Sequence, residues 1–350
     1  MATKQGTVIR PPAARFALLE MLRTALLRPE LTALVSTILV FAFFAVNAGD
    51  RGFLSFPGTR NYLMVAAEIG LIATPVTLLL VAGEFDLSVG TAIGAAGIAI
   101  AYPLAYFHWP LWAALLSGFV VTSLVGLVNG LLVVRLCIPS LLATLGMMFF
   151  LRGLTLAGTL ALTGTTQIYQ LKAAVAGDVL LPLFAGTIFG LPASIFWWLG
   201  LALVSAYFLA NTRYGNWIYA SGGDRDAAVK MGIPVSLVKA WLFVYVSISA
   251  VIVAANGMFY VDMADVAQGL GKEFEGITAA VIGGGATIGG LGSPIGTVLG
   301  ALMLGMISQG FFYTNINDNW FYSFVGAVLV IAVIVNRYTR GAAMRRKSRR

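Results

Sequence analysis

Long apolar stretches without a single acidic or basic side chain are the feature that most limits what this chain can fold into. Three of them are 31–46, 111–134 and 321–335. Each can cross a bilayer as a helix, which needs about 20 apolar residues or slightly fewer. Only 10% of the residues are charged, whereas about 25% are charged in a soluble domain. The sequence therefore excludes a water-soluble core and predicts an all-α, polytopic protein whose outer surface contacts membrane lipid.

Apolar runs separated by turn residues predict about ten spans within a single transmembrane domain, 31–337, which lies between basic tails at 1–30 and 338–350. The run at 275–290 is rich in glycine, so it either crosses the membrane or forms a broken, re-entrant helix that protein covers. The stretch 159–193 is expected to hold short helices over the outer mouth. The predicted spans are 31–48, 61–82, 88–107, 111–134, 139–158, 194–210, 237–261, 275–290, 294–312 and 320–336.

The basic residues indicate how these spans are oriented. Most of the 22 Lys and Arg residues lie in the two tails, at Arg135 and in the 211–239 loop, which the predicted spans place on one side of the membrane. Lys and Arg are enriched in cytoplasmic loops, so both termini are predicted to be cytoplasmic. The formal charge of +8 is thus explained by membrane orientation and not by binding of nucleic acid.

The predicted cytoplasmic stretch 211–236 contains start and stop signals for a short helix. Asp224 is a good N-cap residue, and a glycine followed by Pro234 ends the pattern. A helix of about two turns is unstable alone in water. Its small apolar face therefore docks either into a groove of another protein or back onto its own bundle. The residues of this segment are Gly222, Gly223, Asp224, Arg225, Ala227, Ala228, Met231 and Gly232.

A second polar cluster, between the second and third predicted spans, contains Glu84, Asp86 and Ser88. Asp86 can be the N-cap of the third span, where it would accept hydrogen bonds from amides left free at the helix start. Alternatively, the cluster lines a translocation path or gate, because polar groups at membrane depth are usually functional.

Glu68 and Arg152 are the ionisable residues that lie well inside predicted spans, the second and the fifth. Both lie about 10 Å from the outer ends of these spans at the helical rise per residue. Matching depth permits an ion pair that would join the two spans, and the alternative is that each side chain meets backbone carbonyls or water.

Several sequence motifs of enzymes are absent. The chain has no Gly-x-x-x-x-Gly-Lys-Ser/Thr loop, no His-Glu-x-x-His helix and no Cys/His spacing typical of metal sites. The sequence therefore predicts no ATPase site, no catalytic residues, no metal and no cofactor in this chain.

Four segments resemble, in order, the motifs of permeases of ribose-type ATP-binding-cassette importers, whose superfamily also contains branched-chain amino-acid permeases. Residues 83–90 are similar to that family's Gly-Gly-x-Asp-Leu-Ser-Val-Gly, and residues 139–146, with Arg152 and Gly153 beyond them, to its Pro-x-x-x-Ala-Thr-Leu-Gly signature. Residues 214–233 resemble its cytoplasmic coupling loop, and 283–297 its late glycine-rich motif. The Asp-Leu-Ser-Val-Gly form favours the monosaccharide branch.

This resemblance implies a permease subunit in a bacterial inner membrane that pairs with a second permease subunit. A periplasmic sugar-binding protein would deliver a small sugar or polyol, and helix 225–231 would dock on cytoplasmic ATPase subunits. The competing hypothesis is a stand-alone secondary transporter or channel, driven by an ion gradient through Glu68, Glu84 or Asp86.

Overall fold

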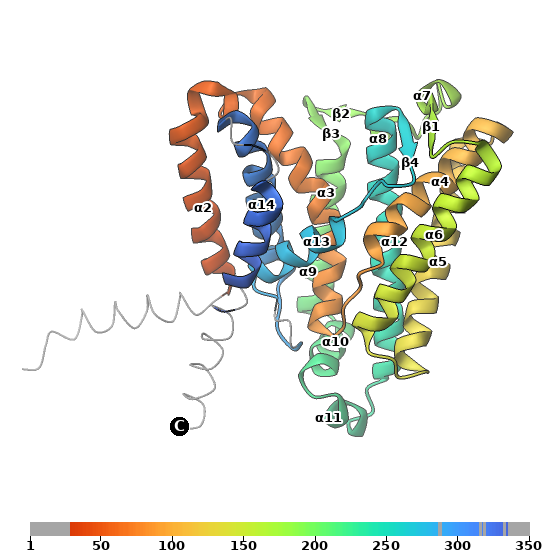
Figure 1. The fold of residues 1–350 in the computed structure, drawn as a ribbon. Helices are drawn as coiled ribbons and strands as arrows, with labels where there is room; N and C mark the ends of the chain where they lie inside the picture. Colours follow the sequence, from red (N-terminus) through yellow and green to blue (C-terminus); the bar gives the residue numbers. More distant parts are fainter. Residues whose placement is uncertain (1–28, 286–288, 315–316, 318–319, 332–333, 335–350) are drawn as a thin grey trace, which may run out of the picture.

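Membrane-length helices dominate the computed structural model, which describes residues 29–285, 289–314, 317, 320–331 and 334 (Figure 1). Within these residues, eight helices are long and apolar enough to cross a membrane, and a shorter apolar helix covers Trp320–Ile331. The prediction of an all-α polytopic protein is confirmed. The eight helices are α2 (Pro29–Ala48), α3 (Phe56–Val81), α4 (Val89–Phe107), α5 (Leu111–Val134), α6 (Ser140–Thr163), α9 (Ala193–Asn211), α12 (Val235–Val261) and α14 (Pro294–Thr314).

The region predicted as a span at 275–290 does not cross the membrane as one helix. Its helix, α13 (Lys272–Ile282), has 11 residues, which at the helical rise cover about half of a bilayer core. Gly284, in the left-handed region at φ +93°, follows the end of the helix. Figure 1 shows α13 at mid-height among the longer helices, so the broken-helix alternative is the correct one.

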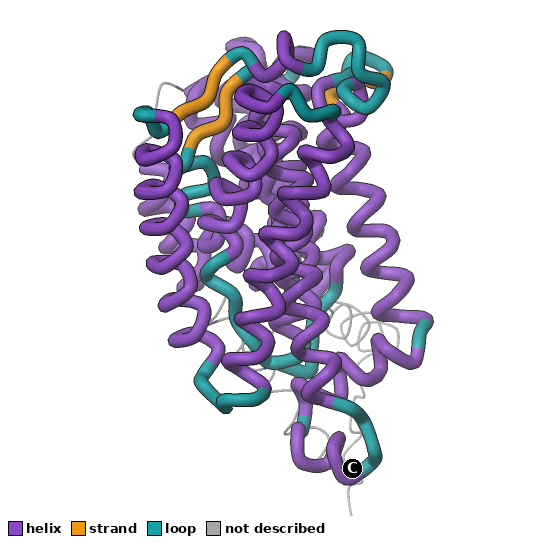
Figure 2. Tube along the Cα trace, turned by 90° about the vertical axis from the view of Figure 1, so that its right-hand side faces the viewer, coloured by secondary structure: helices purple, strands orange, loops and turns teal. Residues whose placement is uncertain are grey.

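Short strands and helices cover one end of the bundle. The short helices were expected for 159–193, whereas the strands were not predicted. β1 (Gln167–Tyr169) pairs antiparallel with β4 (Met263–Asp265), and β2 (Thr187–Ile188) with β3 (Leu191–Pro192). The short helices are α7 (Leu171–Ala174) and α8 (Pro182–Ala185). Figure 2 shows the strands confined to this end, which we call the outer end after its predicted side.

The opposite end, called the inner end, carries two helices that the chain forms between α9 and α12. These are α10 (Arg213–Gly223) and α11 (Arg225–Lys230). α10 was not predicted. Its N-cap is Thr212, whose hydroxyl accepts a hydrogen bond from Gly215 N at 3.2 Å, and such a cap stabilises a helix start.

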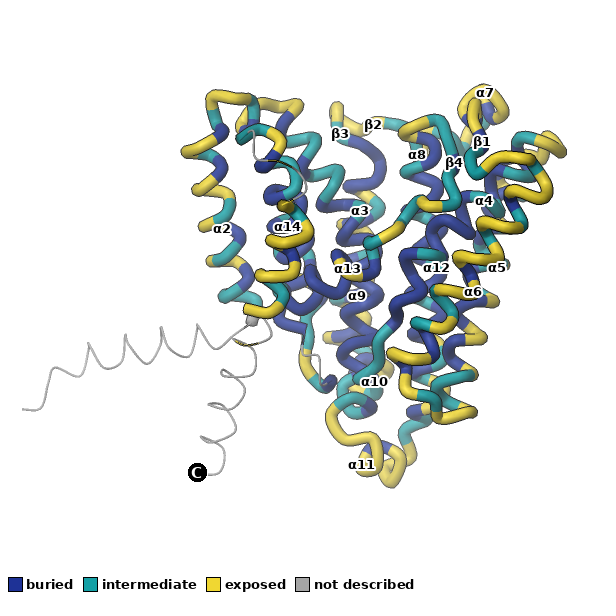
Figure 3. Tube along the Cα trace, in the orientation of Figure 1, coloured by how far each residue is buried: buried dark blue, intermediate teal, exposed yellow. Residues whose placement is uncertain are grey.

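Burial divides the helices into central and peripheral ones (Figure 3). α3 is buried over most of its length, whereas α2 and α6 are largely exposed. α3 begins at Phe56, before the predicted start, because Ser55 caps it and Pro57 fits its first turn. A short π-helix, Gly49–Phe53, joins α2 to α3. The central α3 thus contacts both ends of the bundle and most of the segments described below.

Candidate functional site

The segment α10–α11 at the inner end confirms the predicted start and stop signals. Asp224 Oδ1 accepts a hydrogen bond from Ala227 N at 3.0 Å, and Gly232, at φ +80°, follows the last turn. Ile233 N donates to Ala228 O at 3.1 Å, which closes the helix end. Residues 225–230 therefore form a capped helix although the segment is short.

The apolar face expected on this helix is divided between two sides. Ala228 is buried, with 3% of its surface exposed, so it packs on its own chain and does not belong to a free face. Ala227 is exposed, as are Val229 at 55% and Met231 at 81%. One side of α11 therefore rests on its own bundle, as one of the two alternatives states. The other side is uncovered in this chain, so docking into another protein stays a prediction.

Glycines from three sequence motifs meet where α10 ends. A Cβ on Gly222 would lie 1.9 Å from Val81 O, and one on Gly289 would lie 2.6 Å from Gly222 O and 3.0 Å from Gly83 Cα. Gly290 N donates to Val81 O at 2.8 Å. Only glycine permits backbones to approach this closely. The end of α10, the end of α3 and the turn before α14 are therefore joined at one point, which we call the glycine joint (Gly83, Gly222, Gly289 and Gly290).

α10 makes a further contact with the same turn. Tyr219 donates from its hydroxyl to Gly292 O at 3.0 Å. Burial, together with the carboxylate of Glu30, raises the pKa of Tyr219, so the phenol keeps the proton that this hydrogen bond needs. The contact strengthens the attachment of α10 to residues 289–293.

The connection from α3 to α4, residues 82–88, continues from the glycine joint and is held by α6. Phe85 N donates to Ser140 Oγ and Leu87 N to Thr144 Oγ1, each at 3.1 Å. These hydroxyls stand one helical turn apart in the Pro139 to Gly146 motif and face the same way. Sequence reasoning matched that motif but missed both residues, although their spacing was a usable signal.

Asp86 lies at the end of this connection and is fully buried. Its Oδ1 accepts hydrogen bonds from Ser88 N at 2.8 Å and Ser88 Oγ at 2.7 Å, while Asn129 Nδ2 donates to Ser88 Oγ at 2.8 Å. The prediction that Asp86 is the N-cap residue of α4 is wrong. Ser88 occupies that position and makes no side-chain capping hydrogen bond, while Asp86 accepts a hydrogen bond from the Ser88 amide just before the helix.

Desolvation is the main electrostatic influence on this carboxyl group. Burial raises the pKa of Asp86 to about 6, and the hydrogen bonds from Ser88 oppose that rise. Oδ2 has no hydrogen-bond partner among the described residues. A buried polar atom without a hydrogen-bond partner destabilises the folded protein, so burial of Asp86 lowers the stability of the fold.

Glu84 forms an ion pair with Lys239, in the second turn of α12. Both side chains are mostly buried, 14% and 11% exposed. The sequence places Lys239 at the end of the 211–239 loop, and nothing in its sequence context indicates this partner. The pair neutralises Glu84 and links the 82–88 connection to α12, the helix that follows α11.

The structure corrects the predicted ion pair between Glu68 and Arg152. Among the described residues, Glu68 pairs with Lys272, at 3.8 Å between Oε2 and Nζ, and has no salt bridge to Arg152. Lys272 also pairs with Glu275 at 2.9 Å, while Arg152 is exposed on α6. The prediction failed because the irregular stretch 266–271 brings the start of α13 to the depth of Glu68, which span counting could not anticipate.

The start of α13 also approaches α4 closely. A Cβ on Gly90 would lie 1.9 Å from Glu273 Oε2, and one on Gly94 would lie 2.5 Å from Val266 O. Gly90 and Gly94, which form a GxxxG pair, therefore let the non-helical stretch 266–271 and the start of α13 pack directly against α4. Small residues commonly allow such close packing in membranes.

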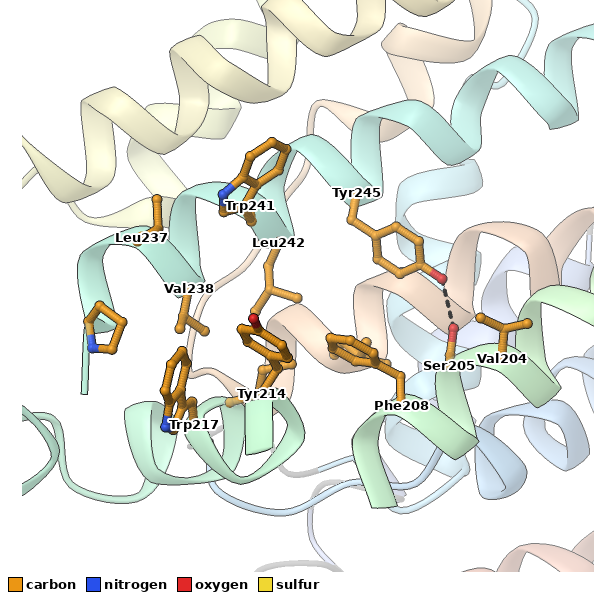
Figure 4. A pocket seen from close by; sticks show the side chains of 13 residues that line it. Val204, Ser205, Phe208, Tyr214, Trp217, Leu237, Val238, Trp241, Leu242 and Tyr245 are labelled. Atoms are coloured by element: carbon orange, nitrogen blue, oxygen red, sulfur yellow. Dashed lines mark hydrogen bonds between the residues drawn. The ribbon is translucent and has the colours of Figure 1, made fainter. Parts of the chain in front are cut away.

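A cavity of about 610 Å³ lies between α9, α10 and α12 (Figure 4). Its wall is almost entirely apolar and aromatic, and its polar contact is the hydrogen bond between Ser205 Oγ and Tyr245 Oη at 2.7 Å. Figure 4 shows Tyr214 and Trp217 of α10 facing α12 across it. This lining suits an apolar occupant and not a hydroxylated solute, so the cavity is not a path for a sugar.

Comparisons with known proteins show which family the chain is similar to. The model of the family described as "Branched-chain amino acid transport system / permease component" matches residues 58–333. The probable ABC transporter permease protein YphD of Escherichia coli is 31% identical over 310 residues, which cover 88% of this chain and 89% of the relative.

Two other relatives carry the names of sugars. The ribose import permease protein RbsC of Escherichia coli is 28% identical, with 88% of this chain and 93% of the relative covered. The xylose/arabinose import permease protein XylH of Sulfolobus acidocaldarius is 27% identical, with 90% and 86% covered. No solved structure matches the chain.

Proposed function

The chain belongs to the family of permease components of branched-chain amino acid transport systems, and we propose that it is the membrane-spanning subunit of an ATP-driven importer for a small sugar or polyol. The names of its relatives, which import ribose or xylose and arabinose, support the sugar class. The chain would do no covalent chemistry. A separate ATPase would supply the energy, in a bacterial inner membrane.

The observation that carries this proposal is the glycine joint. An ATPase that pushes on α11 would move α10, whose end packs against Val81 O and Gly289 without intervening side chains. Val81 leads directly into the 82–88 connection, which Ser140 and Thr144 hold. A backbone contact transmits displacement with little loss because no flexible side chain lies between the parts.

The same contacts favour an ATP-driven importer over an ion-driven transporter. Two of the three carboxylates suggested for an ion path have basic partners, since Glu84 pairs with Lys239 and Glu68 with Lys272. A carboxylate that is already neutralised is a poor carrier site for a coupling ion. We therefore propose that two ATPase subunits, bound at the inner end of two permease subunits, drive transport. A periplasmic binding protein would bind at the outer end.

The test is recovery of the ATPase with the tagged chain from mild detergent. Met231→Glu places a charge on the exposed part of α11, and we expect it to reduce ATPase recovery and sugar uptake about tenfold, because an interface anchor contributes well over 1 kcal/mol. Ser236→Glu, at an exposed position just beyond the segment, is the matched control and keeps both. Reproducible absence of a P-loop protein from wild-type preparations would favour the ion-driven alternative.

A further inference from the structure

A second, polar cavity lies at the outer end, between α3, α9 and α12 and next to α8. Its volume is about 180 Å³, and its lining includes Arg60, Glu68, Lys172, Ser194 and Asn256. Pockets for drug-sized ligands have about 300–1,000 Å³. This cavity is therefore suited to a smaller molecule.

Two buried side chains in its wall have an oxygen without a partner. Ser194 and Asn256 are 5% and 4% exposed, and neither Ser194 Oγ nor Asn256 Oδ1 has a hydrogen-bond partner among the described residues. Asn256 Nδ2 donates to Ile252 O at 2.7 Å, which fixes the amide so that Oδ1 remains the unused atom. Buried polar atoms are normally paired, so these two indicate a missing partner with donor groups.

The charged residues of the cavity supply both donors and acceptors. Arg60 and Lys172 donate only, and the carboxylate of Glu68 accepts only. Glu68 is held by Lys272, at 3.8 Å, from the α13 side. An anion would be attracted by the two cations, but it would be repelled by Glu68, and a fully deprotonated anion could donate nothing to Asn256 Oδ1. Hydroxyl groups, which donate and accept, match the whole set.

We propose that this cavity is a binding site for one monosaccharide or polyol molecule inside a single permease subunit. The site deepens the proposed function and rests on it, since the ligand is the transported solute. Ser194 and Asn256 accept hydrogen bonds from hydroxyl groups of the solute, and Arg60 donates hydrogen bonds to its hydroxyl oxygens. The solute is thus held beside the Glu68 and Lys272 pair before it moves further inward.

Equilibrium binding to the full chain in lipid nanodiscs tests the site, with radiolabelled D-ribose, D-xylose and D-fructose as probes. We expect at least one probe to bind saturably and Ser194→Ala to weaken it about fivefold, as for loss of one hydrogen bond. Asn256→Ala weakens it further. Ser247→Ala is the matched control, because Ser247 Oγ is also buried without a partner in the described chain but does not line the cavity. This variant binds as the wild type does.

Three results would overturn the site: no binding of any probe, equal binding by the wild type and both cavity variants, or displacement of the sugar by inorganic phosphate. Uptake by the assembled importer separates the site from the function. If Ser194→Ala and Asn256→Ala leave the apparent affinity of uptake unchanged, the proposed binding site is wrong, but the proposed importer function stands. If the assembled importer transports none of the three sugars, both the proposed function and the proposed binding site are wrong.

Discussion

At the scale of single residues, ion pairs within the described part of the chain neutralise several of its buried or partly buried charges. Glu84 pairs with Lys239, Glu68 with Lys272, and Lys272 again with Glu275. Asp86 differs, since its hydrogen bonds come from uncharged groups. Buried ion pairs contribute little net stability, but breaking one leaves an uncompensated charge. The pairs therefore fix the position of the segments that carry them.

The Glu84 and Lys239 pair gives a direct prediction. Lys239→Met leaves the Glu84 carboxylate buried without its cation, and we expect a loss of about 3 kcal/mol of stability, near the lower end for buried pairs. The apparent midpoint of thermal unfolding in detergent measures it. The double variant Glu84→Gln with Lys239→Met should recover much of the loss, whereas Lys230→Met, at an exposed lysine of α11, should cost nothing. A Lys239→Met protein as stable as the wild type would contradict the pairing.

At the scale of elements, α10 connects an exposed helix to the interior of the bundle. Val229 of α11 and Met231, the residue that follows α11, are exposed to the outside, and the end of α10 meets Val81 O and Gly289. The two helices differ in what they can tolerate. We expect changes on the exposed side of α11 to affect docking of the proposed ATPase, and changes at the end of α10 to affect the proposed permease itself.

Two adjacent glycines separate these effects. A Cβ on Gly222 would lie 1.9 Å from Val81 O, whereas one on Gly223 would meet nothing within 4 Å. We expect Gly222→Ala to force α10 away from α3 and to lower sugar uptake about tenfold or more while the ATPase still co-purifies, since α11 is unchanged. Gly223→Ala should transport normally. Equal uptake by the two variants would show that the glycine joint does not transmit force.

The elements also show how far the sequence could predict the site. The short helix, its Asp224 cap and its glycine stop follow from local backbone rules and were predicted. The pairing of Glu68 with Lys272 was not predicted, because it depends on how the irregular stretch 266–271 folds. The half-length of α13 was one of two alternatives that the sequence left open for the glycine-rich run 275–290. Ser140 and Thr144 lie between these cases, since their motif was found but their bonds to Phe85 and Leu87 needed the fold.

At the scale of the whole molecule, the proposal depends on which end faces the cytoplasm. The inner end carries α10, α11 and the turn between α5 and α6, and the outer end carries the strands (Figure 1). The excess of Lys and Arg predicts the orientation, and an ATPase can reach α11 only if that prediction holds. A site-specific label can therefore decide whether the proposed assembly is possible.

The chain supplies its own probe, because its one cysteine, Cys137, is exposed in the turn between α5 and α6. A membrane-impermeant maleimide added to intact spheroplasts should leave Cys137 unlabelled and should label it once the membrane is opened. Val179→Cys in a Cys137→Ser background is the matched control at the outer end, where Val179 is 86% exposed, and it should react in intact spheroplasts. Labelling of Cys137 in intact spheroplasts would place α11 outside the cell, where no ATPase could drive it.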